Sequence, residues 1–194
     1  MTVNKSLPEE TTITPTYIGH VIGASFGLVF VLVNSAPLLP ALRIVACILA
    51  VAVFVIVVVG FITAPRTTTP GETDDAVVGF IGRYWIIIGV ETVLLFGGLA
   101  IVRLIEPAAA LGWIALVVGV HFFPLSQLWA PGRAQIMAIA IAMTALGTIG
   151  LVLAIVTQNA DAVAVVSGVG SGIVLLGAAF VVALRTVTQR AAAR

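Results

Sequence analysis

Six long apolar runs, separated by short polar breaks, dominate this sequence. Each has close to the roughly 20 residues that an α-helix needs to cross a bilayer. Lipid offers no hydrogen-bond partner to unpaired backbone groups, and runs of this length do not suit a closed barrel, so each run is predicted to be helical. The sequence therefore predicts an all-α integral membrane protein, a six-helix transmembrane bundle over residues 16–184, with spans at about 16–34, 42–63, 79–102, 108–129, 134–157 and 162–184.

Composition supports lipid as the main solvent. Hydrophobic residues make up 61% of the 194-residue chain and charged residues 9%, whereas a soluble domain carries about 25% charged residues. The lipid bilayer is therefore the expected partner, and no stretch is polar enough to form a second, soluble domain. A net charge of +1 without clustered basic residues argues against nucleic acid. The single cysteine, Cys47, excludes an internal disulfide.

The basic residues predict an orientation. Six spans place both termini on one side, and that side collects seven of the nine basic residues, the other side holding Arg43 and Arg103. The positive-inside rule then puts both termini in the cytoplasm. We therefore expect a multi-pass protein of the cell (plasma) membrane, with a cytoplasmic N-terminal segment at 1–15 and a cytoplasmic tail at 185–194.

A faint internal similarity points to two halves of three helices each. Residues 93–98, followed by Arg103, resemble residues 174–179, followed by Arg185. A repeat unit of three helices gives halves of opposite topology, as in many transporters. The alternative is that apolar helices resemble one another through composition alone.

Small residues recur at helical spacing in the first and last spans. Gly19, Gly23 and Gly27 share one face of the first span, and Gly168 and Gly172 share a face of the last. Such faces let two helix backbones approach closely. They predict helix packing within the chain, with a homo-oligomer interface, a membrane partner protein or a sliding contact as alternatives.

Ionisable residues inside a span are costly and mark candidate functional sites. Glu91 and His121 each lie about 20 Å from the turn that joins the third and fourth spans, at 1.5 Å per residue. Because that turn is short, the two helices are expected to be antiparallel neighbours, and the two side chains to meet near mid-membrane. Tyr84 lies on the same face of the third span as Glu91, so it is included in the predicted site.

A buried carboxyl–imidazole pair has two competing states, one neutral and one ionic. A pair balanced between them can bind and release a proton near physiological pH. This chemistry suits a proton-coupled carrier, or an acid–base pair in an intramembrane enzyme. The structural alternative is a bond between two helices, which contributes only about 0.6–2 kcal/mol in a membrane.

Two further groups of residues carry weaker hypotheses. His20, Gly27 and Asn34 form one stripe of the first span, which predicts a polar path, or else an interfacial histidine. Arg83 is predicted to contact a lipid headgroup or an anion, or to serve as an ordinary interfacial anchor. His20 and His121 lie at different depths and no third ligand accompanies them, so no metal or haem cofactor is expected.

The leading functional hypothesis is a small secondary carrier or permease with a midplane Glu–His site. The alternative is a non-catalytic membrane subunit that binds a partner through its glycine-lined faces. The third is an intramembrane lipid-modifying enzyme, which ranks last because these spans hold few polar side chains. No phosphate-binding loop, GxSxG or HExxH motif is present, and we assign no catalytic residue.

Overall fold

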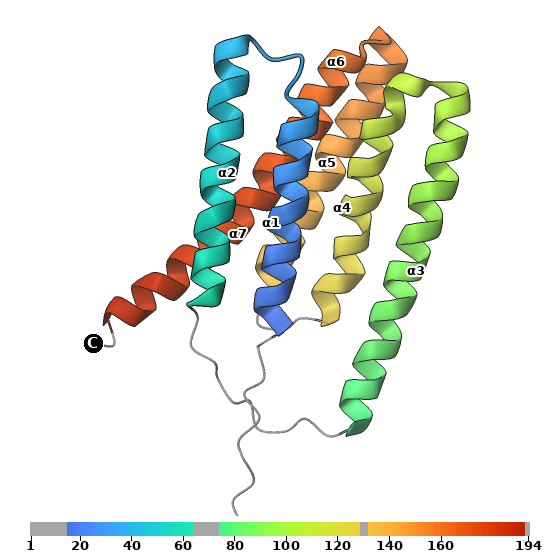
Figure 1. Cartoon of the computed structure of the whole chain (residues 1–194). Helices are drawn as coiled ribbons and strands as arrows, with labels where there is room; N and C mark the ends of the chain where they lie inside the picture. Colours follow the sequence, from blue (N-terminus) through green and yellow to red (C-terminus); the bar gives the residue numbers. More distant parts are fainter. Residues whose placement is uncertain (1–14, 64–73, 129–131, 193–194) are drawn as a thin grey trace, which may run out of the picture.

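The computed structural model describes residues 15–63, 74–128 and 132–192 (Figure 1). Every regular element in these ranges is helical. In chain order they are α1 (Pro15–Asn34), α2 (Pro40–Ile62), α3 (Asp74–Ile105), η1 (Pro107–Ala109), α4 (Ala110–Leu128), α5 (Arg133–Thr157), α6 (Ala160–Val163), η3 (Ala164–Val169) and α7 (Gly170–Ala192). Residues 1–14, 64–73, 129–131 and 193–194 lie outside the described part, and with them most of the predicted N-terminal segment and of the second connection.

Within the described ranges, five stretches are long and apolar enough to cross a membrane, and α1 adds a shorter apolar stretch, Gly19–Asn34. The five are Pro40–Ile62, Gly82–Ile105, Pro107–Leu128, Arg133–Thr157 and Ala160–Thr188. The prediction of an all-α chain with several helices long and apolar enough to cross a membrane is therefore confirmed, and the count of six spans stays a prediction. Two helices run well beyond their predicted spans, because a helix, once started, propagates into polar sequence. α3 begins at Asp74 rather than at 79, and α7 continues past 184 to Ala192.

Local sequence explains where several helices begin. Pro40 opens α2 and Pro107 opens η1, and proline suits the first turn because its missing N–H would have no partner there. The carboxylate of Glu106 accepts a hydrogen bond from the backbone N–H of Ala108 at 3.2 Å. The Asn159 side chain caps α6 in the same way, accepting from the N–H of Ala162 at 3.0 Å.

The helices pack in two groups (Figure 1). α1, α2 and α7 enclose one apolar core, which includes Val31, Val57 and Leu176. α4 and α5 form the most extensive helix pair, and α7 together with η3 joins this pair to the first group. α3 lies at the edge of the bundle and packs chiefly against α4. The possible repeat of two halves of three helices stays a prediction.

Glycines set the spacing of the α4–α5 pair. A Cβ added at Gly112 would lie 2.7 Å from the backbone N of Leu151, and one at Gly119 would lie 2.8 Å from the backbone C of Met143. From the side of α5, a Cβ at Gly147 would meet the backbone of Leu116, whereas one at Gly150 would first meet the Ser167 side chain of η3. Such contacts let the two backbones approach closely, which is how apolar helices associate in lipid.

The sequence predicts that the last span is one regular α-helix. In the structure it contains the π-helical segment η3 instead. A π-helical segment widens the helix locally. Within it Ser167 is fully buried and donates a hydrogen bond from Oγ to the carbonyl of Leu146 at 2.9 Å. Gly168 meets the side chain of Asn34. The irregular segment therefore lies where the last span contacts both α1 and α5.

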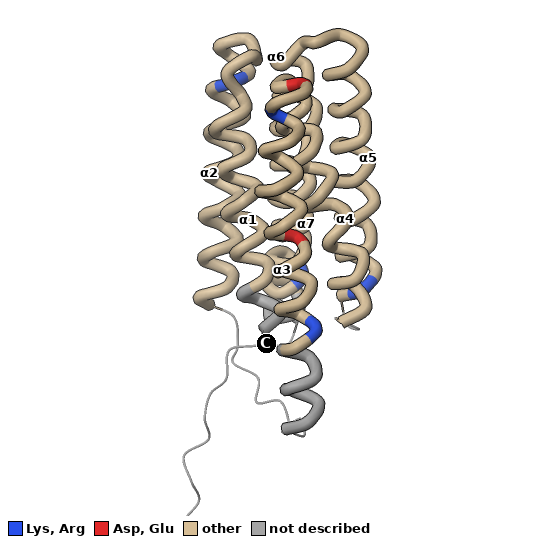
Figure 2. Tube along the Cα trace, turned by 90° about the vertical axis from the view of Figure 1, so that its right-hand side faces the viewer, with Lys and Arg blue, Asp and Glu red and all other residues tan. Residues whose placement is uncertain are grey.

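The bundle has two distinct ends. At the terminal end α1, α3 and α5 begin and α2, α4 and α7 end; the opposite end holds the α1–α2 connection, η1 and α6 (Figure 1). Figure 2 shows basic residues near both ends and an acidic residue within the span region. Arg83, Arg133 and Arg185 belong to the terminal half of their helices, whereas Arg43 and Arg103 belong to the opposite half.

Candidate functional site

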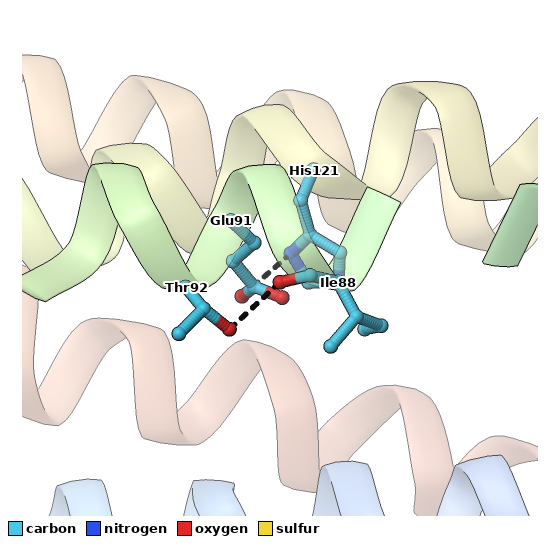
Figure 3. A network of polar contacts seen from close by, with 4 residues as sticks. All are labelled: Ile88, Glu91, Thr92 and His121. Carbon is cyan, nitrogen blue, oxygen red and sulfur yellow. Dashed lines mark hydrogen bonds and ion pairs between the residues drawn. The ribbon is translucent and has the colours of Figure 1, made fainter. Parts of the chain in front are cut away.

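Glu91 of α3 and His121 of α4 meet inside the bundle. Nδ1 of His121 lies 3.1 Å from Oε1 of Glu91, and the two side chains point toward each other across the helix pair (Figure 3). The predicted encounter of these residues, and the equal depth on which it depends, are confirmed. This is the only ion pair among the described residues.

The two helices place the pair differently along their lengths. On α4, His121 is seven residues before Leu128, the last residue of the helix, a distance of about 10 Å along the helix axis. From His121 back to Pro107 there are fourteen residues, or about 21 Å at the same rise. On α3, by contrast, Glu91 lies seventeen residues after Asp74 and fourteen before Ile105. The position of the pair near mid-membrane stays a prediction.

The surroundings of the pair are mainly apolar. The side chain of Glu91 is 17% exposed and that of His121 is 13% exposed. The His121 ring also contacts the ring of Phe122, with centroids 4.3 Å apart. The Thr92 hydroxyl, beside Glu91, is already used, because it donates to the carbonyl of Ile88 at 2.7 Å (Figure 3). Thr92 therefore supplies no hydrogen bond to the carboxylate.

The contact between the two side chains is close but is not a well-aligned hydrogen bond. Nδ1 of His121 is buried and has no hydrogen-bond partner of good geometry among the described residues, although Oε1 of Glu91 is within ion-pair distance. The two groups are therefore in ion-pair contact without an aligned hydrogen bond. A buried nitrogen without an aligned hydrogen-bond partner is costly in an apolar environment. A change that brings a hydrogen-bond partner to Nδ1 would therefore stabilise the site.

A second contact joins α3 to α4 nearer the opposite end. Nε1 of Trp113 donates a hydrogen bond to the carbonyl of Leu94 at 3.0 Å. The indole lies against Gly98, where an added Cβ would come within 2.6 Å of Nε1. Trp113 therefore fastens the edge helix to the bundle.

Tyr84 and Arg83 lie toward the start of the α3 span. Tyr84 is half-buried, and its ring meets that of Trp85 edge-on at 5.9 Å between centroids. It precedes Glu91 by seven residues, or about 10 Å along the axis. Arg83 is exposed, as an anchor or a headgroup contact requires. Membership of Tyr84 in the site, and the anion contact of Arg83, stay predictions.

The stripe of His20, Gly27 and Asn34 faces the last span. His20 borders a small cavity of about 10 Å³ between α1, α2 and α7, enough for about one water molecule. Asn34 is 9% exposed and donates to the carbonyl of Phe30 at 2.9 Å. Between them, Gly27 is in close contact with α7, so helix packing occupies the middle of the stripe. The polar path stays a prediction.

The predicted packing glycines divide into two sets. Gly27 and Gly172 face each other: an added Cβ at Gly27 would lie 2.9 Å from the carbonyl oxygen of Gly172. Gly168, in η3, is crowded by Asn34. At Gly19 and Gly23, by contrast, an added Cβ would meet nothing within 4 Å among the described atoms. The glycine face of α1 is therefore used for packing at Gly27 but not at these two positions.

Two cavities in the described part of the chain have linings that do not include Glu91 or His121. One is the small space beside His20, and the other is a groove at the opposite end, along the start of α2. The described residues also contain no group of three or more His, Cys, Asp or Glu side chains that could hold a metal ion.

Sequence reasoning missed several polar contacts between helices. Nε2 of Gln135, in α5, donates to the carbonyl of Ala178 in α7 at 2.7 Å, and Ser167 bonds Leu146 as described above. It also missed the glycines of the α4–α5 pair. The spacing of seven between Gly112 and Gly119 places both on one helical face and could have revealed that interface.

No protein-family model, no curated protein and no solved structure matches this chain.

Proposed function

We propose that this chain is a small proton-coupled carrier of the cell membrane, with Glu91 and His121 as its proton-binding pair. The observation that supports the proposal is their 3.1 Å approach within two neighbouring apolar spans. Ionisable residues at such depth usually mark ion or substrate pathways, because keeping them there is costly. A carboxylate and an imidazole together can hold, transfer or release one proton.

Transport requires a route to the pair from each side in turn. Neither described cavity borders it, so the proposal requires a second conformation. α3 carries Glu91 and packs chiefly against α4 at the edge of the bundle. We therefore assign the movement to α3: separation of α3 from α4 near the terminal end would open a route, of about 10 Å along α4, to the pair.

Orientation in the membrane belongs to the same proposal. Among the described residues, the terminal halves of the helices hold four arginines, Arg83, Arg133, Arg185 and Arg190, and the opposite halves hold two. The sequence adds Lys5, Arg66 and Arg194 to the terminal side. The positive-inside rule places that end in the cytoplasm.

The test is proton flux in vesicles. The full chain is reconstituted with a pH-sensitive dye inside, and gradients of monovalent cations, organic cations, amino acids and sugars are imposed one at a time. At least one gradient should drive proton flux in the wild type, and Glu91→Gln should reduce it at least tenfold. Glutamine keeps the size of the side chain but cannot exchange a proton at physiological pH.

Asp161→Asn is the matched control. Asp161 is exposed in the first turn of α6, far along the chain from the pair, and its neutralisation should leave the flux unchanged. Equal flux in the wild type and in Glu91→Gln would remove the pair from the mechanism. Flux no greater than that of protein-free vesicles under every gradient would count against a carrier.

A non-catalytic membrane subunit is the second candidate. It is favoured by the edge position of α3, whose outward side chains include Val93 and Phe96, 71% and 67% exposed, and by the lack of a described cavity at the pair. This function predicts that a partner protein is recovered with the chain after crosslinking in native membranes, and that Glu91→Gln leaves the recovery unchanged. No observation favours the intramembrane enzyme.

A further inference from the structure

A groove beside Arg43 lies at the opposite end of the bundle, away from the Glu91–His121 pair. Its volume is about 460 Å³. Its walls come from the α1–α2 connection and from the first turns of α2, and they are formed by Ala36, Leu38, Pro40, Arg43, Ile44, Cys47 and Ile48. Apart from the guanidinium and the thiol, the lining side chains are apolar.

The wall formed by the connection is held in place by local contacts. The backbone N–H of Leu38 donates to the carbonyl of Ser35 at 3.1 Å, which closes a turn. The fully buried Ser35 side chain places Oγ 3.5 Å from Sγ of Cys47. These contacts tie the connection to α2, so the groove exists before anything binds to it.

The groove has a positive charge at its outer end and apolar side chains further along α2. Arg43 is exposed in the first turn of α2, at one end of the candidate membrane span Pro40–Ile62. It makes no ion pair with any described residue. Ile44 and Ile48 follow toward the membrane interior and are 60% and 62% exposed. A free positive charge at headgroup level, above exposed apolar side chains, complements a molecule with an anionic head and a hydrocarbon chain.

We propose that this groove binds one phospholipid of the bilayer, with its phosphate at Arg43 and one acyl chain along Ile44 and Ile48. A free phosphate would leave the apolar walls uncovered and would have a single exposed guanidinium to hold it. An apolar helix of another protein would cover the walls but leave the charge of Arg43 without a partner. A phospholipid satisfies both parts of the groove.

The first test compares two arginines at the same end of the bundle. The purified full chain is titrated with phosphatidylglycerol, and bound lipid is counted by native mass spectrometry. Arg43→Gln should weaken binding of the first lipid by about fivefold, as expected for one basic side chain at a membrane surface. Arg103→Gln should not, because Arg103 is also exposed but borders neither described cavity.

The second test uses Cys47, the only cysteine of the chain, which lines the groove. Its rate of reaction with a maleimide is measured alone, with phosphatidylglycerol and with inorganic phosphate. Phosphatidylglycerol should slow the reaction in the wild type and in Arg103→Gln, but much less in Arg43→Gln; inorganic phosphate should not slow it. Equal rates without lipid in the three proteins would show that the groove itself is unchanged.

Three results would overturn the proposal. Equal lipid affinities of Arg43→Gln and Arg103→Gln would mean that the bound lipid is ordinary surrounding lipid. Protection of Cys47 by inorganic phosphate equal to that by phosphatidylglycerol would make the groove a site for free anions. Protection of Cys47 by dimerisation, with lipid excluded, would assign the groove to a second copy of this chain.

Discussion

Nδ1 of His121 lies 3.1 Å from Oε1 of Glu91, and this contact joins the edge helix α3 to α4. The hydrogen bond from Trp113 to the carbonyl of Leu94 is a second contact between the same two helices. α3 is thus fastened at two levels, by one polar pair and by one indole nearer the opposite end. The pair therefore has a structural role whatever chemistry it performs, and the two roles can be measured separately.

The energetic coupling of Glu91 and His121 is measurable by a double-mutant cycle. We expect Glu91→Ala and His121→Ala to be non-additive by about 0.6–1.7 kcal/mol, the range known for polar contacts between membrane helices. Reversible unfolding in mixed micelles gives the free energy of unfolding of the four proteins. Strictly additive effects would show that the pair does not hold α3 to α4.

Gly98 of α3, against which the Trp113 indole packs, is expected not to tolerate a methyl group. Gly98→Ala would displace the indole and break its hydrogen bond to Leu94, lowering the free energy of unfolding by about 1–3 kcal/mol. Gly97→Ala is the control, because a Cβ there meets nothing within 4 Å among the described atoms. Equal stability of the two variants in the same unfolding assay would contradict the contact.

The close packing of α1 on α7 also predicts a loss of stability when one glycine is replaced by alanine, and α1 itself offers a control. A Cβ at Gly27 would lie 2.9 Å from both the carbonyl oxygen of Gly172 and Cγ of Leu176, so Gly27→Ala should destabilise the protein by about 1–3 kcal/mol. Gly23→Ala should change stability by no more than about 0.5 kcal/mol. A large effect of Gly23→Ala alone would reveal a contact with a second copy or another protein.

The orientation can be checked by labelling in whole cells. In a Cys47→Ser background, one cysteine replaces Asp161 at the opposite end, and in another variant one replaces Arg133 at the terminal end. A membrane-impermeant maleimide should label Asp161→Cys in intact cells, but label Arg133→Cys only after permeabilisation. The reverse pattern would place both termini outside.

The sequence was sufficient to predict the meeting of Glu91 and His121. The rise of an α-helix is fixed, so residue counts from a short turn give the depth of each side chain, and the turn makes the two helices neighbours. The sequence was not sufficient to predict which helices surround the pair. The position of α3 at the edge of the bundle depends on packing, and the start of α3 at Asp74 lies outside the apolar run.

The sequence also did not predict which glycines pack against which helix. Gly19, Gly23 and Gly27 are equivalent by spacing, yet among them only Gly27 meets α7 closely within the described residues, while Gly112 and Gly147 serve an interface that spacing alone did not single out. Likewise, nothing in residues 162–184 distinguishes the π-helical segment η3 from the regular helix around it.

The sequence by itself determined that this chain enters a membrane, that its spans are helices, and at what relative depth its ionisable side chains lie. These follow from the contrast between apolar and polar residues along the chain, and from the need to pair every backbone group in lipid. Only the tertiary structure decided which helices are neighbours. Lipid tails are as apolar as the helix faces, so helix association depends on how closely shaped surfaces fit, and that fit is settled in three dimensions.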